Sequence, residues 1–208
     1  MVECTRWAEL TDALKFHAEL AYTGKVPSEF RFLNAAHPLK IGYDLREPRD
    51  NLDTLLRICD GSPNGGTPLC HHLRQIAAEI TQYADALRQA GQVACVVIAT
   101  DGEASDGDVA EALRPLKALP VLVVLRLCTN EERIVEYWNR VDEDLELSMD
   151  VLDDLAGEAE EVAQVNPWLT YGEPLHRMRE FGVTMKEMDL LDESLLPVEG
   201  FKKVCKFM

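Results

Sequence analysis

The ten residues from Val93 to Gly102, VACVVIATDG, decide the fold class of this chain. The first seven are apolar without interruption and rich in β-branched side chains. Such a continuous run, unlike an alternating one, predicts a strand buried on both faces of a parallel sheet between helices. Polar side chains first appear in the turn Thr100-Asp101-Gly102, at the expected end of this strand.

Strand and helix patterns alternate on either side of this stretch. Further strands are predicted at Phe30 to Leu33, at Val121 to Leu125 and, as an edge strand, at Leu145 to Val151. The apolar spacing of 3.6 residues predicts helices at residues 7–21, 52–59, 69–87, 109–116, 131–141 and 155–165. This alternation predicts an α/β fold with three α/β/α layers, Rossmann-like, around a mostly parallel sheet.

The chain becomes less regular toward its end, where Gly and Pro separate helical fragments around residues 175–181 and 190–196. We therefore predict two regions. Residues 1–154 form an α/β domain that is incomplete at its N-terminus, and residues 155–208 form a mainly helical C-terminal extension.

Composition excludes several classes of partner. The 208 residues hold 21 Lys and Arg against 37 Asp and Glu, a formal net charge of −16. This charge repels phosphate backbones and anionic lipids, which argues against nucleic acid and membrane surfaces. No apolar run approaches the ~20 residues of a spanning helix, and no secretory leader is evident. Six scattered cysteines indicate reduced, buried thiols and favour a cytoplasmic location.

Two loops lie where the strands of an open parallel sheet place their sites, at residues 60–68 and 100–108. In the first loop, Thr67 stands where a phosphate-binding P-loop requires lysine, which argues against a nucleoside triphosphate. Thr67 precedes Pro68 and a long helical pattern, so its hydroxyl is expected to cap that helix.

The second loop holds Asp101, Glu103, Asp106 and Asp108. An EF-hand is excluded because Asp106 occupies the position that requires glycine. No nucleophile elbow is present either. A site for a hard cation and a solvated acidic loop both remain open.

The two loops together resemble a known family. GGTPL at residues 65–69, opening a helix, and VVIATDG at residues 96–102, closing a strand, are similar to motifs of the von Willebrand factor A domain. The resemblance covers roughly residues 4–150. It implies a metal-ion-dependent adhesion site of three loops: D-x-S-x-S after the first strand, a threonine before a helix, and the aspartate of a T-D-G turn. Thr67 matches the second position and Asp101 the third.

The first of these loops is missing. No D-x-S-x-S occurs in the sequence, and its expected place lies ahead of the helix that bears Trp7. The resemblance therefore implies a fragment of a longer protein, or a chain that has lost its first central strand. Thr67 and Asp101 would then hold Mg²⁺ or Ca²⁺ weakly or not at all, completed by a carboxylate of a bound partner. Ser105 and Asp106 are candidates for rim or water-mediated contacts.

A lost central strand would leave two strand edges unpaired, those at Phe30 and Val93. Three occupants are considered for this gap: the C-terminal run Val204 to Met208, a neighbouring chain, or a second copy.

The sequence as a whole favours a non-enzymatic protein–protein interaction module. Its partner would present an acidic side chain if metal is bound, or a basic surface if it is not. One alternative is a Mg-dependent hydrolase or phosphotransferase using Asp101, although neither loop contains a general base or a phosphate-binding Lys or Arg. Another is a purely structural subunit with a vestigial metal site. The partner, the metal and the oligomeric state stay open.

Several other side chains carry expectations of their own. Of the adjacent His71 and His72, one is expected to face water and the other to pack. Trp138 and Trp168 are predicted packing anchors, and Trp168 and Tyr171 are also candidate partner contacts. The charge runs at residues 142–144 and 150–154 are predicted to be solvated.

Overall fold

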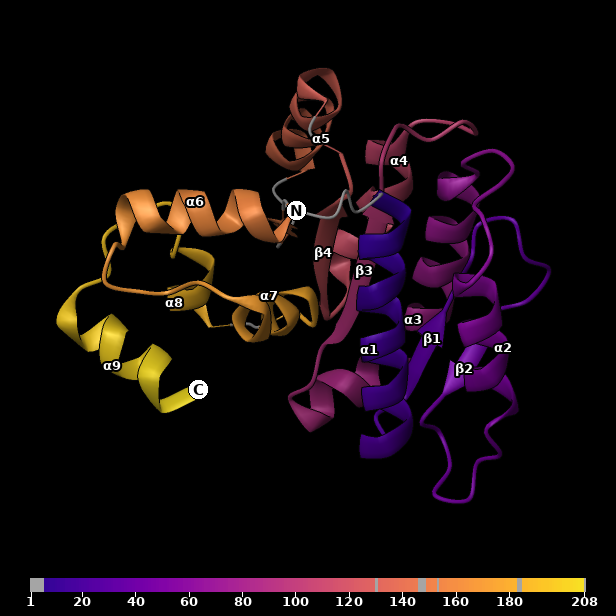
Figure 1. Ribbon diagram of the computed structural model, residues 1–208. Coiled ribbons are helices and arrows are strands. Elements are labelled where there is room, and N and C mark those ends of the chain that lie inside the picture. Colours follow the sequence, from indigo (N-terminus) through magenta and orange to yellow (C-terminus); the bar gives the residue numbers. More distant parts are fainter. Residues whose placement is uncertain (1–5, 130, 146–148, 153, 183–184, 208) are drawn as a thin grey trace. The chain divides into compact units, whose positions relative to one another are not determined.

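The chain folds as a mixed α/β protein (Figure 1). It divides into two compact units, one formed by Met1–Ile76 with Ala104–Ala112 and the other by Ala77–Glu103 with Leu113–Met208. The predicted division at residues 154 and 155 falls inside the second unit and stays a prediction. The computed structural model describes residues 6–129, 131–145, 149–152, 154–182 and 185–207.

A short hairpin with helices packed against it forms most of the first unit. Its strands pair antiparallel, with Phe30 opposite Leu39. The elements are α1 (Arg6–Gly24), β1 (Ser28–Phe30), β2 (Leu39–Ile41), α2 (Asp50–Cys59) and the beginnings of α3 (Leu69–Ala90) and α4 (Val109–Leu113). The strand predicted at Phe30 to Leu33 overlaps β1 at Phe30 alone. The partner β2 was not predicted, because it has only three residues and directly follows Pro38.

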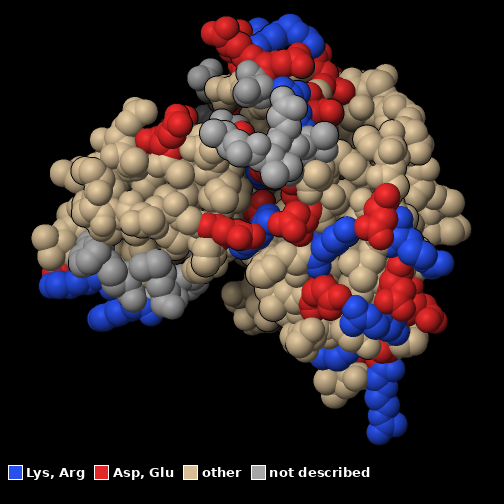
Figure 2. All heavy atoms as spheres, in the orientation of Figure 1, with Lys and Arg blue, Asp and Glu red and all other residues tan. Residues whose placement is uncertain are grey.

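Apolar side chains from α1, α2 and β2 form the core of this unit, including Ala21, Ile41 and Leu55, all fully buried. The outward faces of α1 and α2 carry charges of both signs in close mixture, as Figure 2 shows. Lys15 pairs with Asp60, and Arg49 pairs with Glu19. The charges in this part of the unit therefore largely compensate one another.

A parallel sheet with strand order β3-β4-β5 lies in the second unit. The strands are β3 (Ala94–Thr100), β4 (Val121–Leu127) and β5 (Met149–Leu152). This confirms the parallel pairing predicted from the two apolar runs. This unit also holds the remainder of α3. Its other helical elements, in chain order, are a 3₁₀ turn before β4 (Arg114–Ala118), α5 between β4 and β5 (Glu132–Leu145), and then α6 (Leu155–Val165), α7 (Glu173–Glu180), α8 (Lys186–Asp189) and α9 (Val198–Phe207).

The strand predicted from the run Val93 to Ala99 was expected to be buried on both faces, and this prediction is wrong. In β3, Val96 and Ile98 are buried, whereas Cys95 is exposed and Val97 is 49% exposed. The strand that is buried throughout its second half is β4. Within the described part of the chain β3 pairs with β4 alone, so it is an edge strand. Apolar composition does not distinguish an edge strand from a central one.

Among the described residues, the C-terminal run does not fill the free edge of β3. Of the three occupants considered, Val204 to Met208 is excluded as far as Phe207, because these residues lie in α9; Met208 lies outside the described residues. The hairpin strand β1 pairs with β2 and, among the described residues, not with β3.

The last helices enclose a small apolar cluster around Val162, Leu175, Leu191 and Val204. Tyr171 belongs to this cluster and is only 7% exposed, so its prediction as a partner contact is wrong. The predicted helix at residues 155–165 is confirmed as α6. The one predicted at 190–196 is wrong, because the chain is helical at Lys186–Asp189 and then forms turns.

Buried ion pairs hold α7 to the rest of the second unit. Arg179 on α7 pairs with Asp150 on β5, with Glu158 on α6 and with Asp192. Glu180 pairs with Arg126 of β4, and both side chains are at most 5% exposed. The prediction that Asp150 is solvated is therefore wrong, because α7 brings a cation to it from far along the chain; Asp153, in the same charge run, lies outside the described residues.

Candidate functional site

Backbone hydrogen bonds fix the position of Thr67 in the first unit. Its amide donates to the Ser105 hydroxyl at 3.1 Å, and the Ser105 amide donates to the Thr67 carbonyl at 2.9 Å. The side-chain amide of Asn34 also donates to the carbonyls of Asn64 and Gly66. Thr67 is thus held through its backbone, and its half-buried side chain makes no hydrogen bond to any residue that the structure describes.

Helix α3 is capped from outside its own sequence, and the prediction that the Thr67 hydroxyl caps it is wrong. The two carboxylate oxygens of Asp106 accept hydrogen bonds from the amides of Cys70 and His71, at 3.0 and 2.8 Å. A carboxylate at this position also interacts favourably with the positive end of the helix dipole. Desolvation acts to raise the pKa of Asp106, but the bonds from the His71 and Cys70 backbones outweigh it and hold the pKa below its usual value.

Replacing Asp106 with asparagine is expected to lower the melting temperature at neutral pH. A carboxyl group with a depressed pKa stabilises the fold above the pKa it has when unfolded, near 3.9 for Asp. That contribution disappears as the pH falls through the folded-state value. Melting curves of the wild type and Asp106→Asn should therefore differ at pH 7 and converge in acid. Asp85→Asn, on the exposed side of α3, serves as the control with little effect. An Asp106→Asn difference that stays constant with pH would contradict the capping role.

Two further acidic residues of the second loop also have structural partners. Glu103 forms an ion pair with Arg133. Asp108 accepts a hydrogen bond from the Glu111 amide at the start of α4. Together with Asp106, these residues show that most of the loop's negative charge serves to hold local structure.

Asp101 differs from its acidic neighbours. It follows β3 directly, is exposed, and its carboxylate has no hydrogen bond or ion pair with the described residues. The turn around it is well anchored: the Thr100 hydroxyl accepts from the Gly102 amide at 3.3 Å, and the indole of Trp138 donates to the Gly102 carbonyl at 3.2 Å. Trp138 is fully buried, which confirms it as a packing anchor.

Thr67 and Asp101 offer a hydroxyl and a carboxylate, which are ligands that Mg²⁺ and Ca²⁺ prefer. Thr67 belongs to the first unit and Asp101 to the second. Two protein ligands are few for ions that take six or more, so any binding by this chain alone is expected to be weak. Among the described residues, no group of three or more His, Cys, Asp or Glu side chains is placed to hold a metal ion. Thr67 and Asp101 include only one residue of these four types, so that finding neither supports nor excludes them as ligands.

Comparison with known proteins identifies no relative. No family model matches the chain, and no match was found among curated proteins or solved structures. The resemblance to the von Willebrand factor A domain therefore depends on the motifs that contain Thr67 and Asp101. No helix in the described ranges has the length and apolar character needed to cross a membrane.

Proposed function

We propose that this protein is a non-enzymatic protein–protein interaction module with a three-layer arrangement like that of the von Willebrand factor A domain. Thr67 and Asp101 hold a Mg²⁺ or Ca²⁺ ion weakly, and a carboxylate of the bound protein completes its coordination. Ser105 lies at the rim of this site, whereas Asp106 is occupied in capping α3. The proposal depends on both Thr67 and Asp101 being available to an ion.

One observation carries this proposal: the loop residues around Thr67 and Asp101 have structural partners, while the two oxygen ligands themselves have none among the described residues.

The same loops disfavour an enzyme that uses Asp101 with Mg²⁺. Hydrolysis or phosphoryl transfer needs a general base, or a cation that stabilises the transferred phosphoryl group. Residues 100–108 contain no Lys, Arg or His. Arg133, which reaches this loop, pairs there with Glu103. A binding role requires none of these groups.

Titration with Mg²⁺ and Ca²⁺ in the millimolar range, monitored by calorimetry or NMR, tests the site. Wild-type protein should bind the ion, and Asp101→Ala should weaken binding by about tenfold or more because one of two protein ligands is lost. Thr67→Val should do the same, since valine keeps the backbone bonds to Ser105 and removes only the hydroxyl. Glu103→Gln, in the same loop, should bind as the wild type does.

Two results would overturn the proposal. Absence of any metal response at millimolar concentration would favour a structural subunit with a vestigial site. Turnover of a generic phosphate or carboxylic ester that Asp101→Ala abolishes would instead favour the hydrolase or phosphotransferase.

A further inference from the structure

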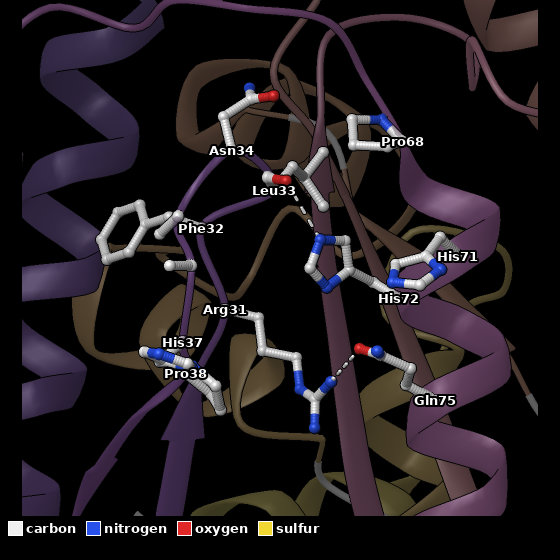
Figure 3. A pocket seen from close by; sticks show the side chains of 12 residues that line it. Arg31, Phe32, Leu33, Asn34, His37, Pro38, Pro68, His71, His72 and Gln75 are labelled. Atoms are coloured by element: carbon white, nitrogen blue, oxygen red, sulfur yellow. Dashed lines mark hydrogen bonds between the residues drawn. The ribbon is translucent and has the colours of Figure 1, made fainter.

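The first unit contains an open pocket of about 400 Å³ between residues 31–38 and the start of α3 (Figure 3). This volume lies within the range of roughly 300–1,000 Å³ that small-molecule sites occupy. Leu33, Pro38 and Pro68 contribute apolar surface. The polar side chains that line the pocket are Arg31, Asn34, His37, His71, His72 and Gln75. None of the described lining residues is acidic, although the chain carries a net charge of −16.

The state of His72 follows from its hydrogen bond. Its Nε2 lies 3.0 Å from the Leu33 carbonyl oxygen, drawn as a dashed line in Figure 3. A carbonyl only accepts, so Nε2 must carry the hydrogen. In the neutral ring the other nitrogen, Nδ1, then holds a lone pair. Nδ1 is buried and has no hydrogen-bond partner among the described residues.

An unpaired buried polar atom costs free energy, which a suitable ligand would recover. In Figure 3 the His72 ring presents Nδ1 on the side of the pocket where Arg31 and Gln75 lie. His72 is half-buried and its neighbour His71 is exposed, which confirms the prediction that one packs while the other faces water.

Among the described lining residues, the permanently charged group is the Arg31 guanidinium, which attracts an anion. Arg31 donates to the Gln75 side chain at 3.1 Å and to Glu29 at 2.6 Å, so Glu29 offsets part of its charge. His37 and His71 are exposed lining residues.

We propose that this pocket binds an organic carboxylate and that His72 takes up a proton when it does. The proton comes from solvent, converts Nδ1 into a donor to the carboxylate, and returns to solvent on release. The apolar wall of Leu33, Pro38 and Pro68 contacts the body of the ligand. A monoanion fits better than a doubly charged phosphate because Glu29 already neutralises part of the Arg31 charge.

Benzoate is a suitable probe, with benzamide as its uncharged counterpart. Calorimetry in two buffers of different ionisation enthalpy should show about one proton taken up per benzoate near neutral pH. Because about one proton is taken up with each benzoate, benzoate affinity should rise by about tenfold for each pH unit, and so by up to about 100-fold from pH 8 to pH 6. Benzamide binding should not change with pH.

Two substitutions separate His72 from the other histidines. In His72→Gln the side-chain amide nitrogen can still donate to the Leu33 carbonyl, but no group at the Nδ1 position titrates. Proton uptake and pH dependence should be lost. His71→Gln changes the exposed neighbour and should retain both.

Failure of benzoate to bind in the millimolar range would overturn the proposal. So would proton uptake that persists in His72→Gln, or NMR shifts confined to His37 and His71. The pocket does not include Thr67 or Asp101, so Asp101→Ala should bind benzoate normally. This result distinguishes failure of the pocket from failure of the metal site.

Discussion

Replacement of Arg179 by methionine should lower the free energy of unfolding by about 3–5 kcal/mol, the cost of breaking a buried ion pair by removing one partner. The Arg179 side chain is 2% exposed and lies between Asp150, Glu158 and Asp192. Desolvation opposes its charge, but the carboxylates of Asp150 and Glu158 outweigh this and raise its pKa. Without the guanidinium, these buried carboxylates would have too little positive charge beside them to balance their own negative charge.

Urea denaturation followed by circular dichroism measures this effect. Arg88→Met is the matched control, because Arg88 pairs with Asp85 on the exposed surface of α3 and such pairs contribute at most about 1 kcal/mol. The double substitution Arg179→Met with Glu158→Met should be less destabilised than the sum of the two single changes, since it removes both charges together. A loss below about 1 kcal/mol for Arg179→Met would show that α7 does not depend on these ion pairs.

Replacement of Gly42 by alanine should lower the free energy of unfolding by about 2–5 kcal/mol, because it combines left-handed backbone strain with overpacking. Gly42 has φ = 81°, and a Cβ there would lie 2.3 Å from the Val26 carbonyl oxygen and 2.6 Å from that of Ala21. Both are backbone atoms: Ala21 lies in the last turn of α1, and Val26, two residues beyond the helix, donates its amide to the Ala21 carbonyl. They have little freedom to move away.

Gly91→Ala separates the two contributions to this effect. Gly91 also has a positive φ, of 63°, but a Cβ there meets nothing within 4 Å. Gly91→Ala should therefore lower the free energy of unfolding by only about 1–2 kcal/mol, from backbone strain alone. Equal losses for the two alanine variants, measured by urea denaturation, would show that the contact of Gly42 with α1 contributes nothing.

Local patterns were sufficient for several helices and for two strands of the parallel sheet. The apolar runs at Val93 to Ala99 and Val121 to Leu125 predicted two strands of the parallel sheet, and periodicity predicted α6 with its observed bounds. These signals succeed because the hydrogen bonds of a helix and the composition of a buried strand involve residues close in sequence. The hairpin partner β2 was missed because three residues carry too weak a pattern.

The sequence likewise predicted one part of the candidate site and not the other. The sequence by itself singled out Thr67 and Asp101, because a short motif records which residue types follow a strand or precede a helix. Only the tertiary structure decided the roles of their neighbours: Asp106 caps a helix that begins 37 residues earlier, and Glu103 pairs with Arg133, 30 residues later. Arg179 likewise meets carboxylates from β5 and α6. A charge looks the same in sequence whether it is solvated or paired, and folding alone brings its partner to it.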